Sequence, residues 1–440
     1  MVGRRAIVSA DSAGLGTGGV RGFLAPYAEI FAIPRAWRFS LAGIIARMPM
    51  SMYGLGTVLL ISAVTGRYGL AGSVSAAGSV GFAVCAPQLG RLTDRLGQHR
   101  VLIPVSVLFA LSVAGLAAAV ALRAPDWTLF ACGMVGGATM PQTGPMARAR
   151  WSALLAGSSR LHTAFSVESV ADELCFVIGP AAVTLLATQL YPAAGVGTAA
   201  LFALTGSLWF ASQRSTEPPV VAVRAEPATS GPAPSEPAAS GGRARPAQVR
   251  PARRARLAAP SLIVLIPVYL FIGAMFVAID LSTVDFATRA GHRPLAGFIL
   301  GCYALGSATG GLWYGSRNWH APASRRLAVT LSLTVAGVCT FWAMPNLLVL
   351  APVIYLCGLT IAPTLIAGYS VLESTALPGR ATEAMSWLST GIAIGLACGS
   401  TAAGFILDAF GPRWGYAFAA AAGVTATLIY LTGLRRMARA

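Results

Sequence analysis

The chain is poor in charged residues, which make up only 11% of its 440 residues, and none of its 32 basic residues is lysine. Soluble globular proteins carry roughly 25% charged residues, so this chain has too few to cover a water-facing surface of its own size. Hydrophobic residues reach 55%, and the mean hydropathy is +0.68. The formal charge of +17 does not indicate nucleic acid, because the arginines lie between apolar blocks. The composition predicts a protein of the lipid bilayer.

Cysteine and histidine are too few and too scattered for a metal site or a disulfide framework. The seven cysteines each lie in an apolar block without a CxxC pair, so we interpret them as small hydrophobic side chains. The four histidines show no ligand spacing such as HExxH, and no phosphate loop or nucleophile–base pattern occurs. We therefore expect no cofactor, no metal and no enzymatic activity. A membrane-embedded enzyme or sensor is the remote alternative.

Long apolar runs dominate the sequence. A membrane-spanning helix needs about 20 mostly apolar residues. This criterion predicts twelve spans, near 38–62, 70–90, 101–122, 127–147, 163–188, 194–212, 261–283, 295–315, 327–344, 346–368, 383–407 and 414–434. Pro345-Asn346 is the turn signal between spans 9 and 10. Because the runs are continuous rather than alternating, they favour helices over strands.

Arginine is unevenly distributed between the two sides that twelve spans define. If both termini are cytoplasmic, 26 of the 32 arginines lie on inner segments, including three in 148–160, and five lie in outer loops. Arg47 lies inside span 1. Cytoplasmic loops carry such an excess, so we expect a multi-pass protein of the plasma membrane with both termini in the cytoplasm. The N-terminal segment has no uninterrupted apolar core of the kind that a cleaved signal peptide needs.

Residues 213–260 differ from the rest in being rich in proline, alanine, serine and arginine. Such a composition cannot bury a core, which predicts a disordered, basic cytoplasmic linker. The predicted organisation is then a cytoplasmic tail, a six-helix bundle, the linker, a second six-helix bundle and a short tail, over 1–36, 37–212, 213–260, 261–434 and 435–440. The expected fold class is an all-α membrane protein with twelve transmembrane helices in two pseudo-symmetric bundles.

Deletion of 222–245 is expected to be tolerated, because loop closure depends only weakly on loop length and the remaining residues still connect the halves. Membrane abundance and activity of the deletion variant check this. Lost activity at normal abundance would instead show that the segment docks at a specific place.

The two halves resemble distant copies of each other. A shift of 220 residues places span 5 on span 11, so that Ala171, Cys175 and Gly179 align with Gly391, Gly395 and Gly399. Small residues at intervals of four share one helix face and allow another helix to approach closely. Paired six-span halves are typical of secondary transporters, whose substrate site lies between the halves.

The stretch GRLTDRLGQHR, residues 90–100, interrupts the apolar pattern between spans 2 and 3. It resembles the signature of the major facilitator superfamily at this position, which is glycine, any residue, leucine, a small residue, aspartate, arginine, a hydrophobe, glycine and a basic cluster. The matching positions that we assign to a gating motif are Gly90, Asp94, Arg95, Gly97 and Arg100. The resemblance covers roughly 37–434.

This resemblance implies a role for Asp94. In the superfamily the aspartate faces the N-terminus of a helix from the other half, pairs with neighbouring arginines and holds the cytoplasmic side shut. A carboxylate at a helix N-terminus is worth about 0.3–1 kcal/mol when exposed and up to ~2 kcal/mol when partly buried. Such a contact biases a balanced two-state equilibrium without locking it. An ordinary basic turn is the alternative interpretation.

Span 5 carries a second resemblance. Exporters of this superfamily have a glycine-rich stretch there that ends in Gly-Pro, and this chain has Gly179 and Pro180. The preceding glycines and the glycine pair after the proline are absent, so uptake stays open as the alternative to export. Span 4, over LFACGMVGGATMPQTG, lacks the arginine that many proton-coupled members carry.

Four ionisable residues lie well inside predicted spans, namely Arg47, Glu168, Asp172 and Glu173. Each costs about 2.5–3.5 kcal/mol at the bilayer centre, which excludes unpaired placement toward lipid. Arg47 and Asp172 each lie nine residues past the start of a span, roughly 14 Å deep. We therefore predict that Arg47 pairs with Asp172 or Glu173, with Glu168 nearer the cytoplasm.

One arginine cannot neutralise three carboxylates, so at least one acid is expected to hold a proton and to take part in coupling or in substrate binding. A static ion-pair network that fixes helix packing is the alternative. Asp280 and Asp285, near the outer end of span 7, are interpreted as part of a solvated helix end.

Together these features predict a monomeric secondary active transporter that works by alternating access. Proton-coupled export of a small organic compound is the leading hypothesis, and an uptake carrier or facilitator of the same fold is the alternative. The expected partners are the substrate, protons and the lipid bilayer, without nucleic acid.

Overall fold

The computed structural model describes residues 20–220, 260–292, 295–375 and 379–437, and the regular structure in these ranges is entirely helical. A short helix, α1 (Val20–Phe31), comes first. The six spans of the first half are α2 (Ala36–Arg47) with α3 (Pro49–Thr65), α4 (Tyr68–Leu96), α5 (Gln98–Ala121), α6 (Asp126–Ala138) with α7 (Thr143–Leu154), α8 (Leu161–Gln189) and α9 (Ala194–Ser212). The second half consists of α10 (Pro260–Arg289), α11 (Leu295–Ser316), α12 (Ala323–Phe341), α13 (Leu347–Gly358) with α14 (Ile361–Thr375), α15 (Ala381–Phe410) and α16 (Pro412–Met437).

The predicted twelve-span fold class is confirmed. Ten of the spans are long and apolar enough to cross a membrane by length and composition, and α12 and the broken span α6–α7 complete the two sets of six. The predicted turn between spans 9 and 10 is present, because α12 ends at Phe341 and Asn346 begins α13 as its N-cap. The Asn346 side chain accepts a hydrogen bond of 3.0 Å from the Val349 amide, which satisfies one of the unpaired amides of the first turn.

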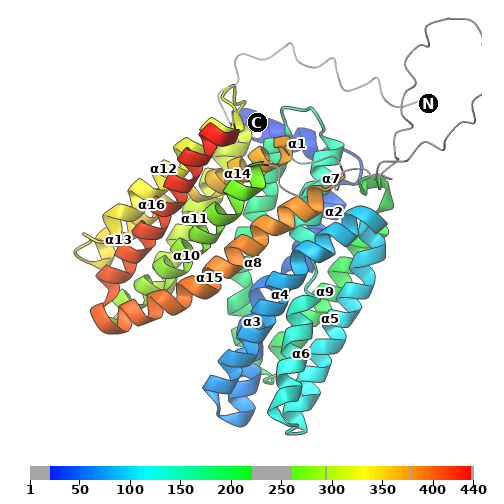
Figure 1. The fold of residues 1–440 in the computed structure, drawn as a ribbon, viewed down its shortest axis with the longest axis vertical. Helices are drawn as coiled ribbons and strands as arrows, with labels where there is room; N and C mark the ends of the chain where they lie inside the picture. The colour runs from blue at the N-terminus through cyan, green and yellow to red at the C-terminus, as the bar shows by residue number, and fades with distance from the viewer. Residues whose placement is uncertain (1–19, 221–259, 293–294, 376–378, 438–440) are drawn as a thin grey trace, which may run out of the picture.

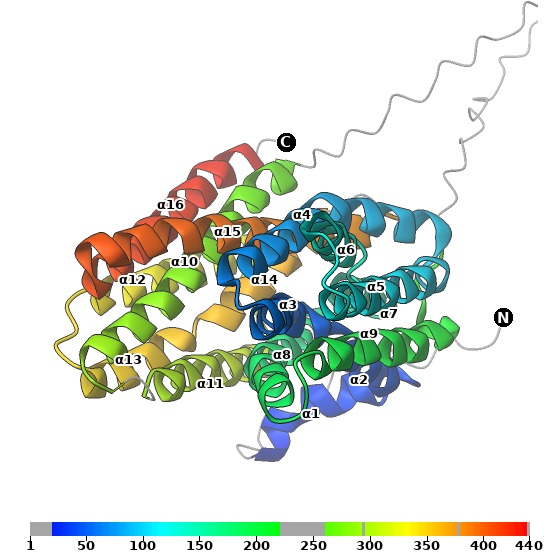
Figure 2. The same cartoon turned by 90° about the horizontal axis from the view of Figure 1, so that it is seen from below.

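The two bundles, α2–α9 and α10–α16, lie side by side and diverge from each other toward one end of the molecule (Figure 1). Seen along the other direction, α15 lies beside α4, and α8 lies beside α11 (Figure 2). We call the end at which Asp94 and Thr163 lie the joined end, and the opposite end the far end. The described ends of the chain, α1 and the last turn of α16, both lie toward the joined end (Figure 1).

The repeat of small residues has the predicted structural consequence. Gly391 lies directly on α10, where an added Cβ would come within 2.9 Å of the Ile266 carbonyl oxygen. In the first half, the face of α8 that carries Cys175 and Gly179 packs on α2 and α3. The Ser51 hydroxyl of α3 donates a hydrogen bond of 2.7 Å to the Cys175 carbonyl there. Span 5 therefore packs on span 1 as span 11 packs on span 7, which is the expected pseudo-symmetry.

Three boundaries differ from the sequence prediction. The segment 1–36 contains α1, whose Tyr27 and Ile30 are buried. Span 4 was predicted to end at residue 147, but α7 continues to Leu154 and buries the first two arginines of the presumed loop 148–160.

The disordered linker was predicted to begin at residue 213, but Arg214–Thr216 form a short 3-10 helix, η1, and Gln213 and Thr216 are buried. The central part of the predicted linker, 221–259, lies outside the described residues.

Candidate functional site

The joined end is held by helix termini that are capped by the opposite bundle. The N-cap residue of α15, Arg380, makes no side-chain capping bond. Asp94, in the last turn of α4, supplies the cap instead, because its carboxylate oxygens accept hydrogen bonds from the amides of Thr382 (3.1 Å) and Glu383 (2.9 Å). These amides have no partner inside their helix, and the helix dipole favours a negative charge there. The predicted contact between Asp94 and a helix N-terminus of the other half is confirmed.

Two positions of the motif require glycine, each for a different structural reason. A Cβ at Gly90 would lie 2.7 Å from the Ser386 hydroxyl and 2.9 Å from the Glu383 Cα, so only glycine allows α4 to approach α15 this closely. Gly97 joins α4 to α5 with a φ of 96°, in the left-handed region that side chains disfavour.

The two arginines of the motif do not pair with Asp94, and no arginine among the described residues lies within ion-pair distance of that carboxylate. The expected pairing is therefore wrong for this conformation, because the carboxylate oxygens are directed at the α15 amides. Arg95 and Arg100 instead line a surface hollow of about 430 Å³ together with Arg214. Glu217 forms an ion pair with His99 there at 2.9 Å.

The second set of contacts at the joined end caps the C-terminus of α11. The Thr163 hydroxyl donates to the Gly315 carbonyl (2.7 Å), and the His162 ring lies 2.6 Å from the Arg317 carbonyl. One turn further along α8, the Ser166 hydroxyl donates a hydrogen bond of 2.6 Å to the Gly311 carbonyl of α11. The last carbonyls of a helix lack partners inside it, so α8 supplies what the end of α11 needs.

Helix α1 crosses this joint, a feature that the sequence analysis did not anticipate. The Tyr27 hydroxyl donates to the Leu312 carbonyl of α11 (2.5 Å) and lies 3.3 Å from the Ser166 hydroxyl of α8. Glu29 pairs with Arg160 at 2.7 Å, and Arg160 also donates to the Asn318 side chain in the second half. Helix α1 therefore contacts both bundles at the joined end.

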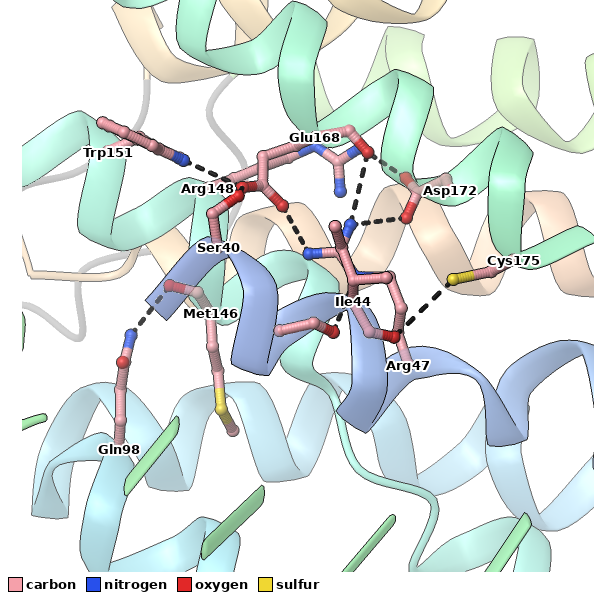
Figure 3. A network of polar contacts seen from close by, with 11 residues as sticks. Ser40, Ile44, Arg47, Gln98, Met146, Arg148, Trp151, Glu168, Asp172 and Cys175 are labelled. Carbon is pink, nitrogen blue, oxygen red and sulfur yellow. Dashed lines mark hydrogen bonds and ion pairs between the residues drawn. The ribbon is translucent and has the colours of Figure 1, made fainter. Parts of the chain in front are cut away.

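A network of buried charges lies inside the first bundle (Figure 3). Arg47 pairs with Asp172 at 2.8 Å, which confirms the predicted ion pair, and it also pairs with Glu168. Glu168 is fully buried and accepts further hydrogen bonds from Ser40 (3.1 Å) and Trp151 (2.9 Å). The network therefore meets the requirement that a buried charge be paired and hydrogen-bonded.

A second arginine, which the sequence analysis had assigned to a cytoplasmic loop, completes this network. Arg148 of α7 is 2% exposed and pairs with Asp172 at 2.6 Å. The expectation that a single arginine faces three acids is therefore wrong, since Arg47 and Arg148 balance Glu168 and Asp172. The Arg148 guanidinium also lies 4.2 Å from the ring centre of Tyr369, which brings the network into contact with the second bundle.

The neighbouring Arg150 has a different, structural task. Its guanidinium is buried and donates to the Phe210 carbonyl (3.1 Å), the Gln213 carbonyl (3.2 Å) and the Gln98 side chain (2.7 Å). It therefore satisfies carbonyls at the end of α9 and ties that end to α5. A basic side chain at a helix C-terminus is favoured by the helix dipole as well.

The remaining acids differ in their environment. Glu173 is partly buried and has no ion-pair partner among the described residues. Asp285 pairs with Arg289 at 2.9 Å near the end of α10, as expected for a solvated helix end. Asp280 does not fit that interpretation, because α10 continues for nine residues beyond it. The Gly179-Pro180 step lies inside the continuous helix α8, where Gly179 packs against Ser51.

Comparison of this sequence with known protein families identifies one family that matches it. The sequence profile of the Major Facilitator Superfamily matches residues 39–317 and 291–439. No curated protein matches the chain significantly in sequence.

Solved structures of similar fold cover almost the whole chain. A bacterial homologue of the iron transporter ferroportin, in an outward-facing state, has 12% identity over 92% of this chain and 100% of its own, with a TM-score of 0.67. The human organic anion transporter MFSD10 has 18% identity over 92% and 99%, with a TM-score of 0.60. The E. coli fucose:proton symporter FucP has 17% identity over 94% and 99%, with a TM-score of 0.60. At these identities the likeness shows the fold alone.

Proposed function

The chain belongs to the major facilitator superfamily, and from this premise we propose that it is a secondary active transporter that moves a small organic compound by alternating access. Membrane transport follows from the family. The structural neighbours are named for iron, organic anions and fucose, so the fold itself indicates no substrate class. The protein is proposed to act as a monomer.

The observation that carries the alternating-access proposal is the position of the contacts between bundles. Every hydrogen bond that joins the two halves of the described chain lies at the joined end. These contacts are few and polar, and several of them cap helix termini, so they can break and re-form as a unit. The excess of arginine at this end supports the proposal that it lies in the cytoplasm and that the protein resides in the plasma membrane. We infer an outward-facing state in which Asp94 is a gating residue.

Proton coupling is proposed from the charge balance. Once two arginines neutralise Glu168 and Asp172, Glu173 is the acid of α8 that is left without a basic partner among the described residues. A proton that crosses 100 mV supplies about 2.3 kcal/mol, which exceeds the ~2 kcal/mol upper value for one carboxylate at a helix terminus. We therefore propose that protonation of Glu173 drives export. Uptake is the alternative, and the change in substrate accumulation caused by a protonophore distinguishes the two directions.

Distances measured between pairs of spin labels are expected to show that the protein exchanges between two conformations. One pair of labels replaces the exposed residues Leu122 and Leu348 at the far end, and a second pair replaces Ala156 and His320 at the joined end. The native cysteines are first replaced by serine or alanine. Both pairs are expected to give two distances, with populations that change in opposite directions when the pH is varied. One unchanging distance at both ends would overturn alternating access.

A further inference from the structure

The joined end contains two joints between the bundles, and only one of them has an aspartate cap. The first joint, between α4 and α15, is held by Asp94. In the second joint, between α8 and α11, the shift of 220 residues that relates the halves places Tyr314 at the position of Asp94. The Tyr314 hydroxyl is buried without a hydrogen-bond partner among the described residues, and Arg160, the N-cap residue of α8, makes no side-chain capping bond. The second joint therefore lacks the contact that Asp94 gives to the first.

Helix α1 supplies a side chain to this second joint from outside the twelve spans. Tyr27 is only 8% exposed, and its hydroxyl reaches both helices of the joint. It donates a hydrogen bond of 2.5 Å to the Leu312 carbonyl of α11, and it lies 3.3 Å from the Ser166 hydroxyl of α8. A Cβ at Gly315 would come within 2.6 Å of the same hydroxyl, so the glycine leaves room for the tyrosine. The Tyr27 side chain is therefore inserted between α8 and α11.

Helix α1 is attached to the first bundle by three further contacts. Residues 32–35 connect it directly to α2, and the two helices lie side by side at one edge of the molecule (Figure 2). The Phe31 ring packs on Trp151 of α7, with ring centres 6.3 Å apart. Glu29 pairs at 2.7 Å with Arg160, directly before α8. Because of these attachments, we expect α1 to stay with the first bundle when the bundles separate, so that its bond to α11 is the one that breaks.

We propose that α1 is a clasp that holds the second joint shut, with Tyr27 as its closing side chain, an inference that rests on the proposed alternating access. Separation of α8 from α11 breaks the bond between Tyr27 and Leu312 and exposes a buried aromatic ring to water. The hydrogen bond alone corresponds to a roughly 2–10-fold change in the ratio of closed to open molecules. The closed state of the joined end then depends on two separate contacts, Asp94 at the first joint and α1 at the second.

Removal of the Tyr27 hydroxyl tests the clasp in the full-length protein that carries spin labels at Ala156 and His320. Tyr27→Phe keeps the ring but removes the donor to Leu312, so the ratio of open to closed joined ends is expected to rise roughly 2–10-fold. Tyr68→Phe makes the same change in a tyrosine of α4 that is 74% exposed, and this matched control is expected to leave the populations unchanged. Equal populations in Tyr27→Phe and in the parent chain would overturn the proposal.

A label on α1 itself shows which bundle the helix follows. It replaces the exposed residue Ala28, and its distances to Ala156 of the first bundle and to His320 of the second are measured separately. The distance to Ala156 is expected to be single, whereas the distance to His320 is expected to take two values whose populations follow those of the Ala156–His320 pair. A single Ala28–His320 distance while the joined end exchanges would overturn the clasp and leave alternating access standing. One unchanging Ala156–His320 distance would overturn both.

Discussion

Replacement of Asp94 by alanine is expected to shift the conformational equilibrium by up to about 30-fold toward the state in which the joined end is open, and to slow transport strongly. Loss of an N-cap side chain costs up to about 2 kcal/mol, which corresponds to a population ratio of about 30. Arg380 provides no substitute cap for α15. Asp94→Asn is expected to have an intermediate effect, because its amide oxygen still accepts one hydrogen bond but carries no charge.

The labels at Ala156 and His320 measure this shift directly, and substrate flux at matched membrane abundance measures its consequence. Gly90→Ala is expected to shift the equilibrium in the same direction without removing a charge, because the added methyl group would collide with Ser386 and Glu383. Arg91→Ala is the matched control, since Arg91 lies in the same turn, is exposed and forms no ion pair with the described residues. Normal distances and flux in Asp94→Ala would show that the motif is only a basic turn.

The sequence predicts the spans well because lipid imposes a single criterion, a continuous apolar run long enough to cross the bilayer. The same criterion explains the error at α7. It ends a span at the first charged residue, yet Arg148 and Arg150 stay buried because each finds partners that are distant in sequence. The spacing TGPMARARW gives one usable signal, since Arg148, Trp151 and the preceding Gly144 lie at helical intervals of three or four on one face.

The contact of Asp94 could be expected from the resemblance, but its partners could not. Nothing in the sequence indicates that α15 lacks a cap of its own or that the motif arginines lie away from Asp94. Helix α1 was missed because its hydrophobic residues are few and include Pro26. Asp280 was misplaced because the apolar run ends before the helix does, so that α10 continues for nine residues beyond this acid.

Replacement of Arg47 by methionine is expected to destabilise the protein by about 3–5 kcal/mol, the usual cost of removing one partner from a buried ion pair. Arg47 is 3% exposed, and its removal would leave the fully buried Glu168 without a cation. The free energy of unfolding in mixed micelles and the yield of monodisperse protein measure the loss. Arg67→Met, which breaks an ion pair with Asp126 between two exposed side chains, is the control and is expected to change neither quantity measurably.

A double variant distinguishes a packing role of this network from a transport role. Arg47→Met combined with Glu168→Gln removes one charge of each sign, keeps the acceptor for Ser40 and Trp151, and leaves Asp172 paired with Arg148. More than half of the lost stability is expected to return. Because the pairs of Arg47 join helices of one bundle only, transport is expected to return with stability. A stable double variant without flux would show instead that the Arg47–Glu168 pair acts in the transport cycle itself.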